Sequence, residues 1–170
     1  MDRFELTREE SVLMVIDIQE RLAAVMERRQ QVVRNAQILI SVAQRLGIPI
    51  IVTEQYPKGL GKTVKELSDM LGDFHAFEKL SFSAYTPEVA SELAKLGRKK
   101  VMICGMETHV CVFQTVRELL RAGYQPFVVG DAVCSRAQDN HQNGLDLMDR
   151  MGAVITNTET VIFDLLKVAG

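Results

Sequence analysis

Short apolar runs alternate along this chain with longer segments in which apolar residues recur every three to four positions. The run SVLMVID at Ser11–Asp17 is almost continuously apolar, which is typical of a parallel strand that is buried on both faces. Similar runs predict five more strands. The six predicted strands are Ser11–Asp17, Ile48–Thr53, Phe74–Glu78, Val101–Cys104, Gln125–Gly130 and Ala153–Ile155.

The amphipathic segments predict helices between these strands. In Met26–Leu46 the apolar residues fall on one helical face, and Gly47 follows as a typical helix end. Thr86 and Pro87 predict a helix start, because proline is favoured at the first helical position. Glu54–Lys62 contains proline and two glycines, which predicts a loop. The other predicted helices are Val64–Met70, Thr108–Ala122, Gln138–Met151 and Thr158–Val168.

Strands that alternate with helices throughout a chain indicate βαβ units and a mostly parallel sheet covered on both faces. We find no repeat and no linker, so residues 1–170 are interpreted as a single domain. Ligands of such sheets bind outside the carboxyl ends of the strands. Asp17, Lys79, Cys111 and Asp131 all fall at or just after predicted strand ends, so the sequence places a candidate site there.

Cys111 is the first candidate for chemistry. It follows the predicted strand Val101–Cys104 and the possible N-cap Thr108, and it therefore falls in the first turn of a predicted helix. The N–H groups at a helix start favour a thiolate over a thiol. The alternative is a small buried hydrophobic residue. Cys104, inside an apolar strand, and Cys134, after the fifth strand, are interpreted as packing residues.

Asp17 and Lys79 have ordinary alternatives as well. Asp17 could cap the next helix, and Lys79 could form a surface ion pair with its neighbour Glu78. However, a nucleophilic thiol needs a group that moves its proton and a cation that stabilises its charge. Asp17 and Lys79 together with Cys111 would supply both.

Several other classes of site have no support in the sequence. His75, His109 and His141 lack metal-ligand spacing, and no CxxC pair accompanies them. His109 is a candidate base, but residues two apart on a helix point to different faces. The glycine motifs of nucleotide-binding loops and the GxSxG motif of serine hydrolases are absent.

Composition and charge restrict the kinds of binding partner and the cellular compartment that we expect. The formal net charge of −2 gives no general attraction for nucleic acid or for an anionic membrane surface. The apolar run Val12–Ile16 is far shorter than the roughly 20 residues that cross a bilayer. The charged start of the chain does not resemble a signal peptide, and three cysteines without a CxxC pair fit a reducing compartment. We therefore expect a cytoplasmic protein.

Four segments, in this order, resemble the isochorismatase-like cysteine hydrolases: VLMVIDIQE around Asp17, FEKLSFSAY around Lys79, ICGMETHVCVFQT around Cys111, and VVGDAVCSR after the fifth strand. They are spread over most of the chain. The segment METHVCV, together with TEQYPKGLGKT after the second strand, most resembles a short, metal-free branch of this family that includes the isochorismatase-domain-containing proteins.

The resemblance implies a three-layer α/β/α, Rossmann-like fold with a six-stranded parallel sheet. It also implies Cys111 as nucleophile, Asp17 as acid and base, and Lys79 as the cation beside them. The Met106–Glu107 peptide bond would be cis, and the N–H groups of Glu107 and Cys111 would form the oxyanion hole. The resemblance further implies a homo-oligomer.

Two departures from the family pattern restrict the substrate. Zinc-binding nicotinamidases carry an aspartate and several histidines after the second strand, whereas TEQYPKGLGKTVKEL has no histidine. We therefore expect no metal and no cofactor, and nicotinamide becomes a weaker candidate. Members that cleave isochorismate lack the cysteine, so the presence of Cys111 argues against that substrate as well.

The resulting hypothesis is hydrolysis of a C–N amide bond in a small molecule through a thioester on Cys111. From their loop positions alone, Gln19, Gln55, Tyr56, Phe82 and Tyr85 are expected at the rim of the substrate pocket. Two alternatives remain open: a catalytically silent scaffold or binding protein of the same fold, and a redox sensor in which Cys134 is the resolving cysteine.

Overall fold

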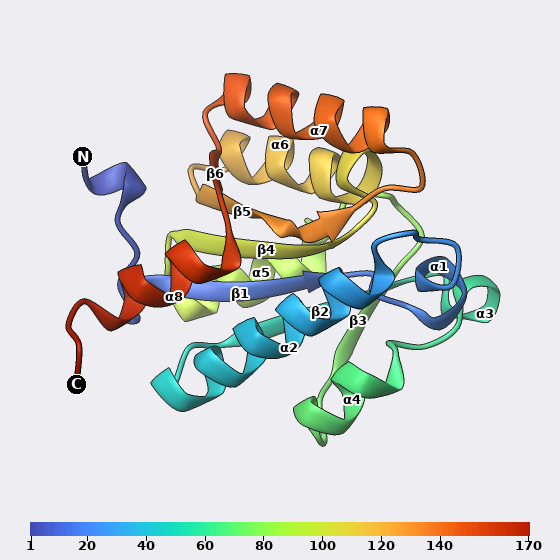
Figure 1. Cartoon of the computed structure of the whole chain (residues 1–170), viewed down its shortest axis with the longest axis horizontal. Helices are drawn as coiled ribbons and strands as arrows, with labels where there is room; N and C mark the ends of the chain where they lie inside the picture. Colours follow the sequence, from blue (N-terminus) through green and yellow to red (C-terminus); the bar gives the residue numbers. More distant parts are fainter.

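The computed structural model describes residues 1–170 and contains one six-stranded sheet in which every strand pair is parallel (Figure 1). The strand order is β3-β2-β1-β4-β5-β6. This confirms the predicted α/β fold. The strands are β1 (Ser11–Ile16), β2 (Ile50–Gln55), β3 (Ala76–Lys79), β4 (Lys100–Met106), β5 (Gln125–Cys134) and β6 (Val154–Thr156).

Helices cover both faces of the sheet (Figure 1). One face is covered by α2 (Arg29–Leu46), α4 (Lys65–Leu71) and α8 (Thr158–Leu166). The other face is covered by α5 (Pro87–Leu96), α6 (Phe113–Arg121) and α7 (Gln138–Met151). The short elements are a 3₁₀ turn at Asp2–Phe4, α1 (Glu20–Ala23), α3 (Pro57–Leu60) and a π-helix at Thr108–Val112. None of the helices is long and apolar enough to cross a membrane.

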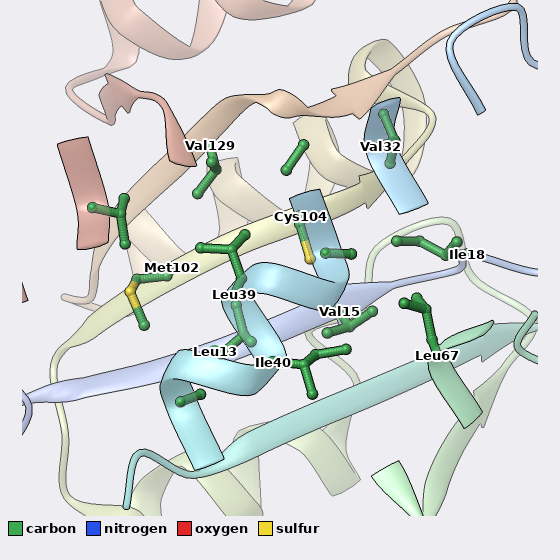
Figure 2. Packing of buried hydrophobic residues seen from close by; sticks show 14 of the residues in the cluster. Leu13, Val15, Ile18, Val32, Leu39, Ile40, Leu67, Met102, Cys104 and Val129 are labelled. Atoms are coloured by element: carbon green, nitrogen blue, oxygen red, sulfur yellow. The ribbon is translucent and has the colours of Figure 1, made fainter. Parts of the chain in front are cut away.

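The central strand β1 is buried along its whole length, as its apolar sequence predicts. Side chains alternate across a strand, so Leu13 and Val15 pack toward α2. Val12, Met14 and Ile16 pack toward the helices on the opposite face. Figure 2 shows Leu39 and Ile40 of α2 lying over β1, with Met102 and Cys104 of β4 beside them. Cys104 is fully buried in this cluster, which confirms its role in packing.

Three boundaries differ from the prediction in ways that affect the site. β3 begins two residues later than predicted and includes Lys79, and a single turn of helix, α3, lies within the predicted loop Glu54–Lys62. β5 continues to Cys134, so Asp131 lies inside the strand and not at its carboxyl end. Asp131 Oδ1 accepts hydrogen bonds from the N–H and hydroxyl of Thr158, and Asp131 thereby anchors α8. Asp131 is therefore not a site residue.

The segment after β4 also differs from the expected N-capped α-helix. A π-helix precedes α6, and its N-cap position is Glu107 instead of Thr108. The Thr108 hydroxyl lies 2.7 Å from His141 Nδ1 in α7, so it holds two elements together and does not cap a helix. π-Helical turns inside longer helices are frequent at functional sites.

Candidate functional site

The carboxyl ends of β1, β3 and β4 bring together three residues that are far apart in the sequence. Asp17 follows β1, Lys79 ends β3, and Cys111 lies in the π-helix after β4. Lys79 Nζ lies 2.7 Å from Asp17 Oδ2, and neither side chain has more than 1% of its surface exposed. The Cys111 thiol lies near enough to Asp17 and Lys79 for both charges to affect its pKa, and Cys111 as a whole is 5% exposed. The three residues form one buried cluster.

The backbone and a neighbouring threonine fix the Asp17 carboxylate. The Thr53 hydroxyl donates to Asp17 Oδ1 at 2.8 Å, and the Asp17 N–H donates to the Thr53 carbonyl at 3.2 Å. Asp17 has a φ of 54°, a left-handed conformation that aspartate tolerates better than most residues. Its carboxylate therefore contacts Thr53, Lys79 and Cys111, and it does not cap α1, whose N-cap position is Gln19.

The Lys79 ammonium is surrounded by acceptors. In addition to its ion pair with Asp17, it donates hydrogen bonds to Gln55 Oε1 at 2.6 Å, to the Phe82 carbonyl at 2.8 Å and to the Ser81 carbonyl at 3.1 Å. The alternative partner Glu78 lies instead 3.8 Å from Lys62 at the surface. Lys79 is thus a buried cation that is directed into the site.

The electrostatics of the cluster correct one expectation. Burial and the negative charge of Asp17 together raise the pKa of the Cys111 thiol to about 12, because Lys79 opposes these two effects only in part. The prediction that the helix start favours a resting thiolate is therefore wrong. Burial also raises the pKa of Asp17, despite the opposing charge and hydrogen bond of Lys79. The resting site combines a protonated thiol with a carboxyl group that is a stronger base than an ordinary aspartate.

Glu107 lies between β4 and the π-helix, and the Met106–Glu107 peptide bond is cis. The Glu107 side chain is buried, and its Oε1 accepts two bonds of 3.0 Å from the backbone N–H and the Nε of Arg136. The Glu107 backbone N–H donates to no carbonyl in the chain, although hydrogen-bonding groups in a buried segment are normally paired. This N–H therefore has no backbone acceptor within the chain.

Two glycines allow the elements around the site to approach closely. A Cβ on Gly105, whose φ is 149°, would lie 2.2 Å from the carbonyl oxygen of Ile16 on the paired strand. A Cβ on Gly144 of α7 would lie 3.1 Å from the Cα of His109. The first contact brings the segment that carries Asp17 close to the segment that carries Cys111, and the second supports the π-helix.

The five predicted rim residues divide into two groups. Gln19 is fully buried: its amide donates to the carbonyls of Gln55 and Gly61, and its oxygen accepts from the Gln55 N–H. The Gln55 side chain joins Lys79 to the Leu80 carbonyl. These two glutamines support the site from within and do not line a rim.

The three aromatic residues have more open positions. Tyr56 and Phe82 are 51% and 54% exposed. Tyr85 is half-buried and packs edge-on against Tyr124, with ring centroids 6.1 Å apart. Tyr56 and Phe82 are adjacent to two residues of the Lys79 network, Gln55 and Ser81. They remain candidates for contact with a substrate.

The remaining histidines and cysteines lie apart from the cluster. His109 Nδ1 lies 2.8 Å from the hydroxyl of Ser135, and burial lowers the pKa of His141. No three His, Cys, Asp or Glu side chains converge closely enough to hold a metal ion. Cys134 packs in the hydrophobic cluster on the α2 side of the sheet, whereas Cys111 belongs to the opposite cluster.

Two threonines that the sequence analysis overlooked complete the site. Thr53 holds Asp17, as described above. The Thr115 hydroxyl donates to the Cys111 carbonyl at 2.6 Å and accepts from the Ala84 N–H at 2.8 Å. It therefore links the Cys111 turn to the loop after Lys79. The spacing of four residues between Cys111 and Thr115 on a helix was the available signal.

Comparison with known proteins gives consistent matches over most of the chain. A model of the isochorismatase domain matches residues 11–160. The chain is 41% identical over 165 residues to the "Secreted isochorismatase effector Isc1" of Phytophthora sojae, covering 94% of this chain and 79% of that protein. It is 39% identical over 157 residues to "Isochorismatase domain-containing protein 1" of Salmo salar, covering 92% of this chain but only 55% of that protein.

Among solved structures, the "MAR1 Ribonuclease from Caenorhabditis elegans" superposes with a TM-score of 0.92 at 37% identity. The match covers 96% of this chain and 85% of that one.

Proposed function

Because the chain belongs to the isochorismatase domain family, we propose that it is a cysteine hydrolase that cleaves the C–N bond of a small amide. The observation that carries the proposal is the buried Lys79–Asp17 pair, 2.7 Å apart, next to the Cys111 thiol. A buried ion pair is costly to desolvate, so its presence beside a thiol and at the strand ends favours a catalytic role.

The first step is attack of sulfur on the carbonyl carbon. Because the resting thiol is protonated, its proton passes to Asp17 as the carbon–sulfur bond forms, and the carbonyl π electrons move to oxygen. The raised pKa of Asp17 makes it a better acceptor for that proton. Lys79 holds the Asp17 carboxylate in place, and its positive charge stabilises negative charge that develops on sulfur.

The Glu107 N–H, which donates to no carbonyl in the chain, supports an oxyanion hole formed with the Cys111 N–H. Removing one such donor typically costs about 10²–10³ in turnover. Asp17 then returns the proton to the leaving nitrogen, and an amine or ammonia departs as the C–N bond breaks. Water, deprotonated by Asp17, hydrolyses the thioester and restores the thiol.

The experiment is a screen of small primary amides, carbamoyl compounds and ureas for release of ammonia. We expect at least one substrate, complete loss of its turnover in Cys111→Ala, and a fold that is unchanged by circular dichroism. Cys104→Ala is the matched control, because Cys104 is a buried thiol that contacts the α2 core and not the site. Turnover that survives in Cys111→Ala would overturn the assignment.

A ribonuclease is the second candidate, because the C. elegans relative with 37% identity is called a ribonuclease. The net charge of −2 favours a small molecule over nucleic acid. Incubation with a labelled single-stranded RNA decides the matter: cleavage that disappears in Cys111→Ala would make the ribonuclease the better description.

Two further expectations remain proposals. We propose a cytoplasmic location, which localisation of a fluorescent fusion tests. We also propose a homo-oligomer, because exposed apolar side chains, among them Tyr56, Leu80 and Phe82, flank the Lys79 segment. Light scattering measures the number of subunits. A silent scaffold would show neither amide turnover nor RNA cleavage.

A further inference from the structure

The buried glutamines Gln19 and Gln55 form a chain of hydrogen bonds that ends on the Lys79 ammonium. Gln55 Oε1 accepts from Lys79 Nζ at 2.6 Å, while Gln55 Nε2 donates to the Leu80 carbonyl at 2.8 Å. The amide therefore contacts both the ammonium and the backbone of the residue that follows Lys79. Its two ends fix the side chain and the loop in one geometry.

The Gln19 side chain hydrogen-bonds to the backbone of Gln55. Its Oε1 accepts from the Gln55 N–H at 2.7 Å, and its Nε2 donates to the carbonyls of Gln55 and Gly61 at 2.9 and 2.8 Å. Every hydrogen-bonding group of this amide except one acceptor lone pair is used, and the side chain has no exposed surface. Gln55 is therefore held at the end of β2 by bonds on both sides of its peptide unit.

The choice of an amide at position 55 has an electrostatic consequence. Lys79 must stabilise Asp17 and offset the charge that develops on Cys111. A carboxylate at position 55 would compete for the same ammonium and would add a negative charge beside two groups that become negative. An apolar side chain would leave the ammonium without one of its acceptors. A neutral acceptor fixes the cation and leaves its charge for Asp17 and Cys111.

We propose that Gln55 is a positioning residue, whose amide fixes the Lys79 ammonium against Asp17, with Gln19 as its support. The proposal rests on the proposed function, because it assigns to Lys79 a role in the reaction. Gln55 contacts no reacting atom and acts through Lys79 alone.

The test is a double-mutant cycle on the reactivity of Cys111, which needs no substrate. The probe is methyl methanethiosulfonate: the thiolate attacks its sulfenyl sulfur, a protein–S–S–CH₃ disulfide forms, and methanesulfinate leaves. The rate at pH 8 is followed by mass spectrometry of the peptide that contains Cys111. We measure the wild type, Gln55→Leu, Lys79→Met and the double variant.

Gln55→Leu is expected to slow modification about tenfold, which corresponds to roughly one unit in the thiol pKa. Lys79→Met is expected to slow it at least as much, and Gln55→Leu should then add less than twofold in the Lys79→Met background. The control Gln44→Leu removes a similar amide that bonds the Met70 carbonyl away from the site, and it should change nothing. Equal slowing by Gln55→Leu in both backgrounds, or no slowing in the wild-type background, would overturn the proposal.

Gln55→Glu covers the case in which the leucine variant does not fold. It keeps the shape of the side chain and an acceptor for Lys79, although it loses the amide donor to the Leu80 carbonyl. We expect Gln55→Glu to fold, as checked by circular dichroism, and to slow modification of Cys111; an unchanged rate would contradict the proposal. The double-mutant cycle measures how Gln55 and Lys79 together affect the reactivity of Cys111, whether or not any amide is hydrolysed. A negative result in the cycle can therefore be distinguished from a negative result in the amide screen.

Discussion

Substitution of Gly105 by alanine should disrupt the site without touching any of its chemical groups. The new Cβ would lie 2.2 Å from the Ile16 carbonyl oxygen and 2.8 Å from the Ile16 Cβ, both shorter than any normal contact. Ile16 and Gly105 are register partners on β1 and β4. To relieve the clash, the ends of these strands must move apart by close to an ångström, and these ends lead directly to Asp17 and to the Cys111 turn.

The expected magnitudes follow from this geometry. Overpacking a buried position costs about 1–3 kcal/mol, and the left-handed φ of 149° adds about 1 kcal/mol for a residue with a side chain. We therefore expect a loss of about 2–4 kcal/mol in the free energy of unfolding by urea titration. A misplacement of about 1 Å at a reacting centre can cost about 10²-fold in rate, so turnover should fall by about that factor.

The matched control is Gly97→Ala. Gly97 ends α5 with a φ of 65°, and a Cβ there would meet nothing within 4 Å. Gly97→Ala introduces the conformational strain without a steric clash. The free energy of unfolding should therefore fall by about 1 kcal/mol while activity is retained. The reasoning is refuted if Gly105→Ala is as stable and as active as Gly97→Ala. A folded Gly105→Ala with full activity would show that the close approach of β1 to β4 does not determine the positions of Asp17 and Cys111.

Three further predictions follow from the site. Turnover should require the ionised Asp17 carboxylate, so the rate should fall as pH drops through an inflection above the ordinary aspartate value of about 3.9, measured from the pH dependence of kcat/KM. An inflection at or below that value would contradict the raised pKa. Lys79→Met removes the cation that lowers the pKa of Asp17, so the inflection should move to higher pH and kcat should fall. An inflection at the wild-type pH would show that Lys79 does not influence the ionisation of Asp17. Thr115→Val removes two hydrogen bonds, one to the Cys111 carbonyl and one from the Ala84 N–H, each worth about 1 kcal/mol. The fold should be retained, but kcat should fall about tenfold, which corresponds to about 1.4 kcal/mol in the barrier. A kcat equal to that of the wild type would show that the Cys111 turn does not depend on these bonds.

The convergence of Asp17, Lys79 and Cys111 was predictable from the sequence because of a general property of parallel sheets. The carboxyl ends of all strands meet at one edge, so polar residues that follow buried strands gather there. Asp131 shows the limit of this argument. Its strand continues past the glycine that seemed to end it, and the carboxylate bonds to Thr158 instead.

Side-chain direction and burial were the parts that the sequence could not supply. Gln19 and Gln55 stand at loop positions that suggest a rim, yet each amide faces inward, where backbone groups and Lys79 satisfy it. The ionisation of Cys111 was misjudged for the same reason. A helix start favours a thiolate, but burial beside the Asp17 carboxylate outweighs that effect, and both facts depend on tertiary structure.

The central claim is that Cys111 forms a covalent thioester with the substrate. The most direct measurement is rapid quenching of the protein with an amide that it turns over, followed by mass spectrometry of the intact chain and of its peptides. The account predicts a mass increase equal to the acyl group, located on the peptide that contains Cys111 and absent from Cys111→Ser. Turnover that persists in Cys111→Ser, or an acyl group found only on another residue, would contradict it.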